Sequence, residues 1–344
     1  MAGNLTPREI LRGLLQGVAP PRPLFLPIVF SHAARVENMP LRSFLANPTK
    51  ISNTLRQIRP RLHSDGIACY FDPFLEAEAL GATLQWTSDD GPPSLHWPEN
   101  IRKGELPESP PSQQDAAKTS RVAIAIDVIR RLKAVVRDDC LLMASVTGPL
   151  TLAALLLQLD PSDALGHPDI PSSALDLASA VISGIAAAFV EAGVAVVFIR
   201  EDFVPALSPE ELESWFSRLE TTINIVRFYE ALPVLLLTCK EPPAANAEAI
   251  ARQPADCVVC PLLDEATPYI AAISSLGLSR FGIALPPELF DSGASSAANF
   301  EDAVRRVAGL VSDVGPAIVT TAGDLPAAAD MERLNKLWEN VRRS

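Results

Sequence analysis

The chain has 344 residues, of which 48% are hydrophobic and 20% charged, so it can bury a large core and is not expected to be disordered. Its formal net charge of −12 disfavours nucleic acids and anionic lipids as partners, because their phosphates would be repelled. No apolar leader opens the sequence, and the longest apolar stretch, 177–190, is shorter than the roughly 20 residues that span a bilayer. We therefore expect a cytoplasmic protein with reduced cysteines and no membrane contact.

The predicted elements alternate between helices and short aliphatic strands. Thr6 and Pro7 predict the N-cap and first residue of a helix that reaches Leu15. Aliphatic runs typical of buried strands follow at residues 24–30, 66–71, 141–146, 194–199, 233–238, 255–260, 280–285 and 316–321. Helical patterns lie between them, at residues 49–61, 74–80, 118–136, 149–158, 171–192, 209–230, 243–252, 265–276, 299–312 and 328–342. This order predicts an α/β protein, a (β/α)8 TIM barrel with an N-terminal helix.

A proline-rich segment, Thr87 to Ala117, interrupts the alternation after the second strand. Its apolar residues Trp97 and Ile101 favour an ordered insertion that packs on the barrel over a flexible linker. No other change of composition divides the chain. Residues 1–344 are therefore predicted to form a single barrel domain.

The carboxyl ends of barrel strands form the active site in proteins of this fold. Polar residues at these ends are His32, Arg35, Asp72, Arg200, Glu201, Asp202 and Lys240. The charged triplet 200–202 directly after an aliphatic strand is typical of a pocket rim. Asp72 before Pro73 also suits the N-cap of the helix at 74–80, and Arg35 on a loop also suits a solvent-exposed cation.

Cys257 and Cys260 have the spacing of half a zinc site, but residues three apart on a strand point to opposite faces. We expect buried structural thiols there. The sequence contains no HExxH motif, no phosphate-binding glycine loop after a strand and no GxSxG motif. Zinc peptidase, nucleotide-binding and serine-hydrolase functions therefore find no support.

Several segments, in order along nearly the whole chain, resemble the uroporphyrinogen decarboxylase superfamily. They are residues 8–11 (REIL), 65–67 (DGI), 72–82 (DPFLEAEALGA), 147–153 (TGPLTLA) and 207–209 (LSP). The superfamily contains porphyrinogen decarboxylases and, in a second branch, zinc-dependent methyltransferases that serve corrinoid proteins. The resemblance implies a (β/α)8 barrel, in agreement with the strand count, and a homodimer.

The decarboxylase pattern places two catalytic residues in this chain. Arg35 matches the second arginine of the first loop, and Asp72 matches the aspartate that binds the pyrrole nitrogens. The family's remaining arginine, tyrosine, serine and histidine fall on Ser31, Leu155, Asp202 and Ala322. The resemblance implies cofactor-independent decarboxylation of a small carboxylated substrate, a pyrrole, a tetrapyrrole or a relative. Arg35 would bind carboxylate and Asp72 would stabilise positive charge, while His32, Arg200, Glu201, Asp202 and Lys240 would contact the substrate.

The methyltransferase pattern leaves one zinc ligand. Its histidine and two cysteines fall on Leu237, Cys239 and Ala322, whereas a catalytic zinc site normally has three protein ligands. The alternative function is methyl transfer linked to a corrinoid protein or folate, with zinc at Cys239. A third hypothesis is a catalytically degenerate barrel that binds a ligand without turnover.

Overall fold

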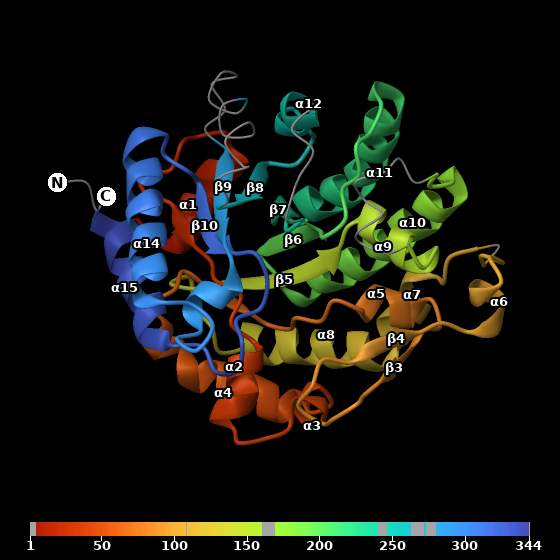
Figure 1. Cartoon of the computed structure of the whole chain (residues 1–344), viewed down its shortest axis with the longest axis horizontal. Coiled ribbons are helices and arrows are strands. Elements are labelled where there is room, and N and C mark those ends of the chain that lie inside the picture. The colour runs from red at the N-terminus through yellow and green to blue at the C-terminus, as the bar shows by residue number, and fades with distance from the viewer. Residues whose placement is uncertain are drawn as a thin grey trace.

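The computed structural model describes residues 5–107, 109–159, 169–239, 246–262, 272 and 280–343. One parallel sheet curls into a nearly closed barrel in the order β1-β10-β9-β8-β7-β6-β5-β2 (Figure 1). Its strands are β1 (Leu24–Phe25), β2 (Gly66–Ala68), β5 (Leu141–Thr147), β6 (Val196–Glu201), β7 (Leu232–Leu237), β8 (Cys257–Pro261), β9 (Phe281–Leu285) and β10 (Ile318–Thr321). The predicted (β/α)8 fold is confirmed, and each strand overlaps its predicted run.

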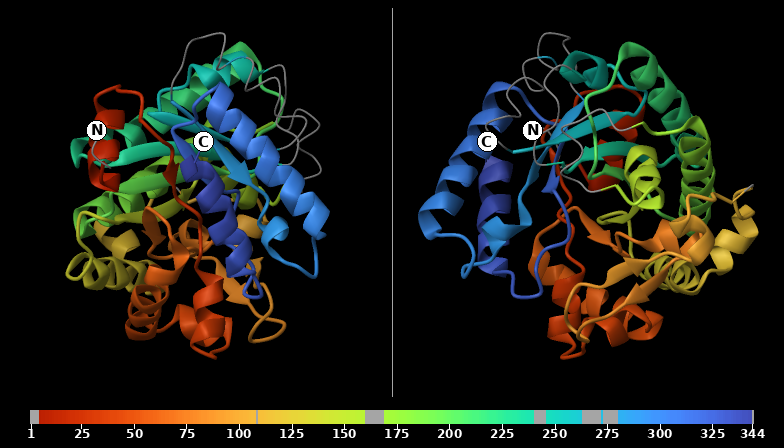
Figure 2. Two further views of the ribbon diagram at one scale, coloured as in Figure 1. Left: turned by 90° about the vertical axis from the view of Figure 1, so that its left-hand side faces the viewer. Right: turned by 45° about the vertical axis from the view of Figure 1, so that its right-hand side comes forward.

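Helices surround the sheet, and α14 and α15 lie side by side on its outside (Figure 2). The helices before the sixth strand are α1 (Pro7–Leu15), α2 (Ser31–Val36), α3 (Leu41–Leu45), α4 (Pro48–Leu62), α5 (Leu75–Ala79), α6 (Glu99–Arg102), α7 (Gln113–Lys118), α8 (Ser120–Lys133), α9 (Pro149–Leu156) and α10 (Ser172–Ala192). Those that follow are α11 (Pro209–Phe228), α12 (Ala247–Ala251), the short 3-10 helix η4 (Pro287–Phe290), α14 (Ala297–Asp313) and α15 (Met331–Arg343). The helix predicted at 265–276 lies outside the described residues except for Ala272.

Alternation of side chains along each strand separates two cores. Inward-facing residues such as Leu141, Phe198 and Val234 form one buried cluster with Ile10 and Leu14 of α1. Outward-facing residues pack beneath the surrounding helices in a second, larger cluster. Helix α1 therefore covers the amino-terminal end of the barrel, which leaves the carboxyl ends for a site. The predicted cap is confirmed: the Thr6 hydroxyl accepts from the Glu9 amide, and the Glu9 carboxylate accepts from the Thr6 amide.

The barrel closes between β1 and β2 through hydrogen bonds of Asp65, most of them to its side chain, instead of a strand ladder. The Asp65 carboxylate, next to β2, accepts hydrogen bonds from the Phe25 amide at 2.8 Å and from two nitrogens of Arg22 at 2.7 and 2.8 Å. The Asp65 amide in turn donates to the Phe25 carbonyl at 2.9 Å. Arg22 also lies over the ring of Trp338 on α15. We call Arg22, Asp65 and Phe25 the seam.

Strand β1 is shorter than the predicted run 24–30, and its backbone bonds to β10 end at the Leu26 amide, which donates to the Val319 carbonyl at 2.9 Å. Beyond it, side chains replace backbone acceptors. The Ile28 amide donates to the Thr321 hydroxyl at 3.0 Å, and the Phe30 amide donates to the Asp324 carboxylate at 2.7 Å. This substitution frees the chain to turn into α2 at the carboxyl end of the barrel.

The insertion after the second strand is ordered, as predicted, but begins earlier than Thr87. It contains an antiparallel pair, β3 (Thr83–Gln85) and β4 (Ser94–His96), followed by α6 and α7. Trp97 and Ile101 are buried in the outer core, as their apolar character predicts.

Helix α10 runs over Ser172–Ala192 and exceeds the apolar stretch seen in the sequence. Its length and hydropathy would suffice to cross a membrane, but 78% of its most apolar window is buried inside the protein. It packs against α7, α9 and α11. This burial is what a core helix of a globular protein shows.

Candidate functional site

The end of β6 sends its charged residues to opposite sides of the barrel wall. Val196 and Phe198 face the interior, and the alternation carries Arg200 to the same side. Arg200 is 3% exposed, and its guanidinium lies 5.1 Å from the ring centre of Phe71. Its Nε atom donates to both carboxylate oxygens of Asp202, at 2.8 and 3.1 Å. The predicted residues Arg200 and Asp202 are therefore together at the barrel mouth.

Glu201 points outward instead and is fully buried. Its carboxylate accepts from the amides of Leu150 and Thr151 at 3.1 and 2.8 Å, from the Thr151 hydroxyl at 2.6 Å, and from the Trp215 indole at 3.0 Å. A carboxylate at the first turn of α9 satisfies helix amides that would otherwise be unpaired. Burial raises the pKa of Glu201 to about 7, although these donors oppose the rise. Glu201, which the sequence predicts as a substrate contact, has its oxygens engaged in holding the first turn of α9.

Asp72 is paired with a cation that the sequence did not reveal. Arg121, on α8, contacts the Asp72 carboxylate through Nη1 and Glu78 through Nε at 2.5 Å. The other Asp72 oxygen accepts from the Phe74 amide at 2.8 Å. Asp72 thus binds a backbone amide just before α5, near the predicted cap. Its charge is balanced by Arg121, so the structure does not present it as the free anion that the expected catalytic role needs.

A buried glutamate outside both family patterns lies beside Arg200. Glu76 on α5 is 1% exposed, and its Oε2 accepts from the Thr147 hydroxyl at 2.8 Å. Thr147 on β5 is the register partner of Arg200 on β6. Burial raises the pKa of Glu76, against the Thr147 hydroxyl and the charge of Arg200. Sequence reasoning missed Glu76, because it lies within the family-like segment 72–82 but matches none of the site residues in the decarboxylase or methyltransferase pattern.

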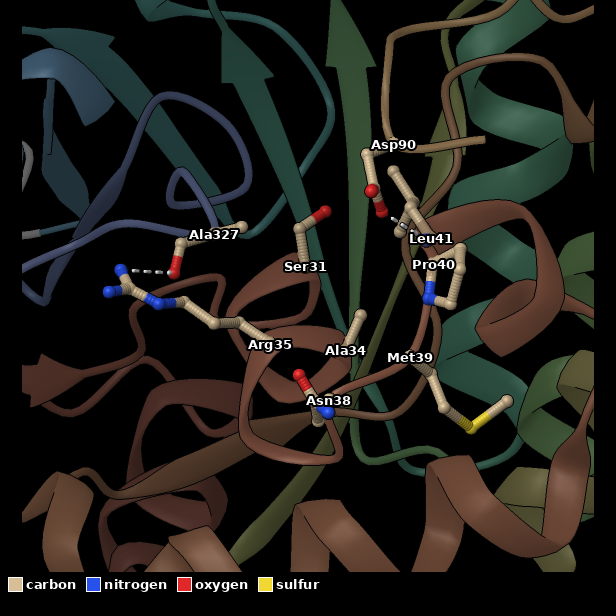
Figure 3. A pocket seen from close by; sticks show the side chains of 9 residues that line it. All are labelled: Ser31, Ala34, Arg35, Asn38, Met39, Pro40, Leu41, Asp90 and Ala327. Carbon is tan, nitrogen blue, oxygen red and sulfur yellow. Dashed lines mark hydrogen bonds between the residues drawn. The ribbon is translucent and has the colours of Figure 1, made fainter. Parts of the chain in front are cut away.

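Arg35 and His32 lie at another part of the rim. Figure 3 shows Arg35 reaching toward the Ala327 carbonyl, at 3.5 Å, beside a cavity of about 440 Å³. Asp90 of the insertion lines the opposite wall of this cavity. The Nδ1 atom of His32 contacts the same carbonyl at 3.1 Å, and burial lowers the pKa of this imidazole. Both residues therefore hold the loop after β10, and Arg200 is not among the residues that line the cavity.

The cysteines and the predicted zinc ligands do not form a metal site among the described residues. Cys257 belongs to the inner core and Cys260 to the outer core, as the spacing predicts. Burial raises the pKa of Cys239 to about 12. No group of three or more His, Cys, Asp and Glu side chains in the described part of the chain could hold a metal ion. Zinc does not fit these residues, and Lys240 lies outside them.

Polar side chains thus gather at the carboxyl ends of β5 and β6, which is where (β/α)8-barrel proteins bind their ligands. The fold and this site define a barrel protein of that class. The family described as uroporphyrinogen decarboxylase (URO-D) matches residues 6–342. The chain belongs to this family, which confirms the resemblance seen in the sequence.

Solved structures support the fold. A methyltransferase from Methanosarcina mazei superposes with a TM-score of 0.74 at 16% identity, covering 99% of each chain. A candidate vitamin-B12 independent methionine synthase from Listeria monocytogenes reaches a TM-score of 0.49 at 13% identity, over 94% of this chain and 95% of its own. The first likeness supports the barrel fold, and the second is too weak to support an argument. No curated protein matches the chain by sequence.

Proposed function

We propose that this protein is a uroporphyrinogen decarboxylase-like enzyme that removes CO2 from a carboxylated pyrrole, tetrapyrrole or related substrate without a cofactor. The observation that carries the proposal is the guanidinium of Arg200. It is buried, faces the barrel interior above Phe71, and keeps its Nη2 atom without a partner in the described residues. A buried arginine with a free donor is suited to a carboxylate, because it pairs charge and hydrogen bond at once.

The reaction breaks the bond between the carboxylate carbon and the substrate. The electron pair stays on the substrate carbon, CO2 leaves, and a proton is added to that carbon. A pyrrole ring that is protonated during this reaction carries positive charge, which an anion nearby stabilises. Asp202 is the anion beside Arg200, and its side chain is 44% exposed at the mouth. Arg35 on the rim would bind a second carboxylate of a larger substrate.

The test is anaerobic incubation with uroporphyrinogen, followed by mass analysis of the carboxyl groups that remain. We expect product from the wild type and at least a tenfold loss of kcat/KM in Arg200→Met. Arg305→Met is the matched control, because Arg305 is 72% exposed on α14 and should leave the rate unchanged. If the wild type gives no carboxyl-depleted product, the porphyrinogen version of the proposal is wrong, and a ligand-binding barrel without turnover is favoured.

Methyl transfer linked to a corrinoid protein or folate is the second candidate. It is supported by the likeness to the methyltransferase from Methanosarcina mazei and by Cys239, which follows β7. Any further zinc ligands would have to lie outside the described residues. The measurement is metal content of the purified protein. About one zinc per chain, lost in Cys239→Ser, would favour this candidate over decarboxylation.

We also propose a homodimer of single-domain chains in the cytoplasm. Light scattering of the purified protein measures the oligomeric state, and a monomer across the micromolar range would contradict the homodimer. Limited proteolysis tests the single domain, which a stable fragment that folds alone would contradict. Localisation of a tagged chain tests the cytoplasmic location.

A further inference from the structure

Three buried polar atoms at the end of the barrel have no hydrogen-bond partner in the described part of the chain. They are Oε1 of Glu76, Nη2 of Arg200 and Oγ of Ser145. All three residues are more than nine-tenths buried. Buried polar groups are nearly always paired in folded proteins, so a group of unpaired ones points to a missing ligand.

The topology brings these three atoms to one region. Ser145 and Thr147 lie two apart on β5 and face the barrel interior, where Thr147 is in register with Arg200 and Ser145 with Phe198. The Thr147 hydroxyl holds Oε2 of Glu76 at 2.8 Å, so the free Oε1 belongs to a side chain fixed in place. A carboxylate is the group that matches a guanidinium and a hydroxyl as donors.

The protonation state of Glu76 decides whether a carboxylate can enter. An ionised Glu76 would repel the ligand and attract Arg200, whereas a protonated Glu76 is a third donor. Burial raises the pKa of Glu76, which favours the protonated form. Ketosteroid isomerase offers a general precedent for a buried carboxylic acid that donates a hydrogen bond.

Among the charged groups around Glu76, Arg200 is the one whose charge affects the pKa of Glu76. Helix α5 packs against β5, α8, α9 and α10. Neither β5 nor α9 carries a charged residue. Arg121 of α8 is paired with Asp72 and Glu78, although its Nη2 atom has no hydrogen-bond partner in the described residues. On α10, Asp176 pairs with Arg218, and Glu191 accepts from Tyr229.

We propose that Glu76, Arg200 and Ser145 form a carboxylate subsite that accepts its ligand only while Glu76 carries a proton. The inference deepens the proposed function, since the ligand is the carboxylate of the same substrate class. Binding above the pKa of Glu76 then takes up one proton per ligand. In the complex, Nη2 of Arg200, Oε1 of Glu76 and the Ser145 hydroxyl all donate to the carboxylate oxygens.

The experiment is calorimetric titration with pyrrole-3-acetate between about pH 5 and pH 9, in pairs of buffers that differ in ionisation enthalpy. We expect the Kd of the wild type to rise about tenfold per pH unit above the pKa of Glu76, with uptake of about one proton. Glu76→Gln keeps a donor amide, so it should bind the probe with a Kd that no longer changes with pH. Arg200→Met should weaken binding at least tenfold at every pH.

Glu78→Gln is the matched control, because burial also raises the pKa of Glu78, to about 7, on the same helix. It should retain the pH dependence of the wild type. The proposal is overturned if the wild type does not bind the probe, if its Kd is independent of pH, or if Glu76→Gln still follows the wild-type profile. Should Glu76→Gln fail to fold, proton uptake by the wild type decides alone. Proton-coupled binding without turnover of uroporphyrinogen would remove the proposed reaction and leave the subsite standing.

Discussion

The carboxyl group of Glu201 occupies the space in which a side chain at position 148 would begin. A Cβ atom placed on Gly148 would overlap Cδ and Oε1 of Glu201 and lie 2.7 Å from its Cγ. Glu201 cannot move aside without loss, because four donors hold its two oxygens. The glycine of the Thr147-Gly148-Pro149 turn is therefore required by a carboxylate on the neighbouring strand.

Gly148→Ala should lower the free energy of unfolding by about 3 kcal/mol, because the new methyl group overpacks a site that cannot relax. Urea denaturation followed by circular dichroism measures the change. Gly309→Ala is the control, since Gly309 lies in α14 and, apart from its chain neighbours and the nearby backbone of this helix, no atom lies within 4 Å of the place its new methyl group would take. It should be neutral or stabilise by about 0.5–1 kcal/mol. Equal stability of the two variants would contradict the close approach of Glu201.

The stability of the fold should fall as pH rises from about 4.5 to 7 through the buried carboxyls. Burial raises the pKa of Glu201 to about 7 and that of Asp324 to about 6. Both groups hold their protons more tightly in the folded chain than in the unfolded one, so the folded state binds more protons in this window and loses stability as they leave. For Glu201 the loss is on the order of 3 kcal/mol.

The measurement is urea denaturation of the wild type and Glu201→Gln at intervals between about pH 5 and pH 8. Glu201→Gln should have a shallower slope, and it should also be less stable by about 2–4 kcal/mol at acid pH, because an amide nitrogen would face donors around α9. Glu211→Gln is the control, because a glutamine can keep the contact of Glu211 with the Ser208 amide in the capping box of α11. Parallel slopes in the wild type and Glu201→Gln would show that another group titrates.

Asp72→Asn should destabilise the protein by about 3 kcal/mol, because it leaves the buried guanidinium of Arg121 with Glu78 as its one anionic partner. Arg121→Met should lower the stability by a similar amount, because it removes the cation that pairs with Asp72. The double variant is expected to recover part of the loss, which a double-mutant cycle in urea measures. Strictly additive losses, or an Asp72→Asn variant as stable as the wild type, would restore Asp72 as a candidate for the free anion of the site.

Asp65→Asn should cost about 3 kcal/mol, since it removes the charge that joins Arg22 to β1 at the seam. Thermal unfolding measures the loss. Asp302→Asn is a suitable control, because its pair with Arg305 is exposed on α14 and contributes less than about 1 kcal/mol. If Asp65→Asn unfolds at the same temperature as Asp302→Asn, packing alone would be enough to close the barrel.

Periodicity was enough to predict the eight-stranded barrel, because buried strands such as 141–147 and 232–237 are continuous aliphatic runs. It also placed Arg200 and Asp202 at the mouth, since the residue after a buried strand must emerge at its carboxyl end. It did not assign Glu201 to the outer side, although the same alternation contains that information. Whether Glu201 faces inward or outward depends on which of its strand neighbours face the barrel interior. The two clusters of buried residues in the structure show this.

The partners of the site were beyond sequence reasoning. Arg121 lies inside an ordinary amphipathic helix and meets Asp72 across 49 positions of chain. Glu76 is held by Thr147 across 71 positions. No local sequence pattern predicts such contacts, because they form only when α5 and α8 pack against β5.

Because no strand ladder joins β1 and β2 at the seam, the barrel is a curled sheet with β1 and β2 as its two edge strands. Seven strand-to-strand ladders hold the order from β1 to β2, while the return contact rests on Asp65 and its neighbours. Local opening starts where backbone pairing is sparsest. In hydrogen exchange, the Phe25 and Asp65 amides should therefore lose protection together and well before those of β6 and β7. The barrel would open locally between β1 and β2. The site at β5 and β6 would keep its structure during this opening.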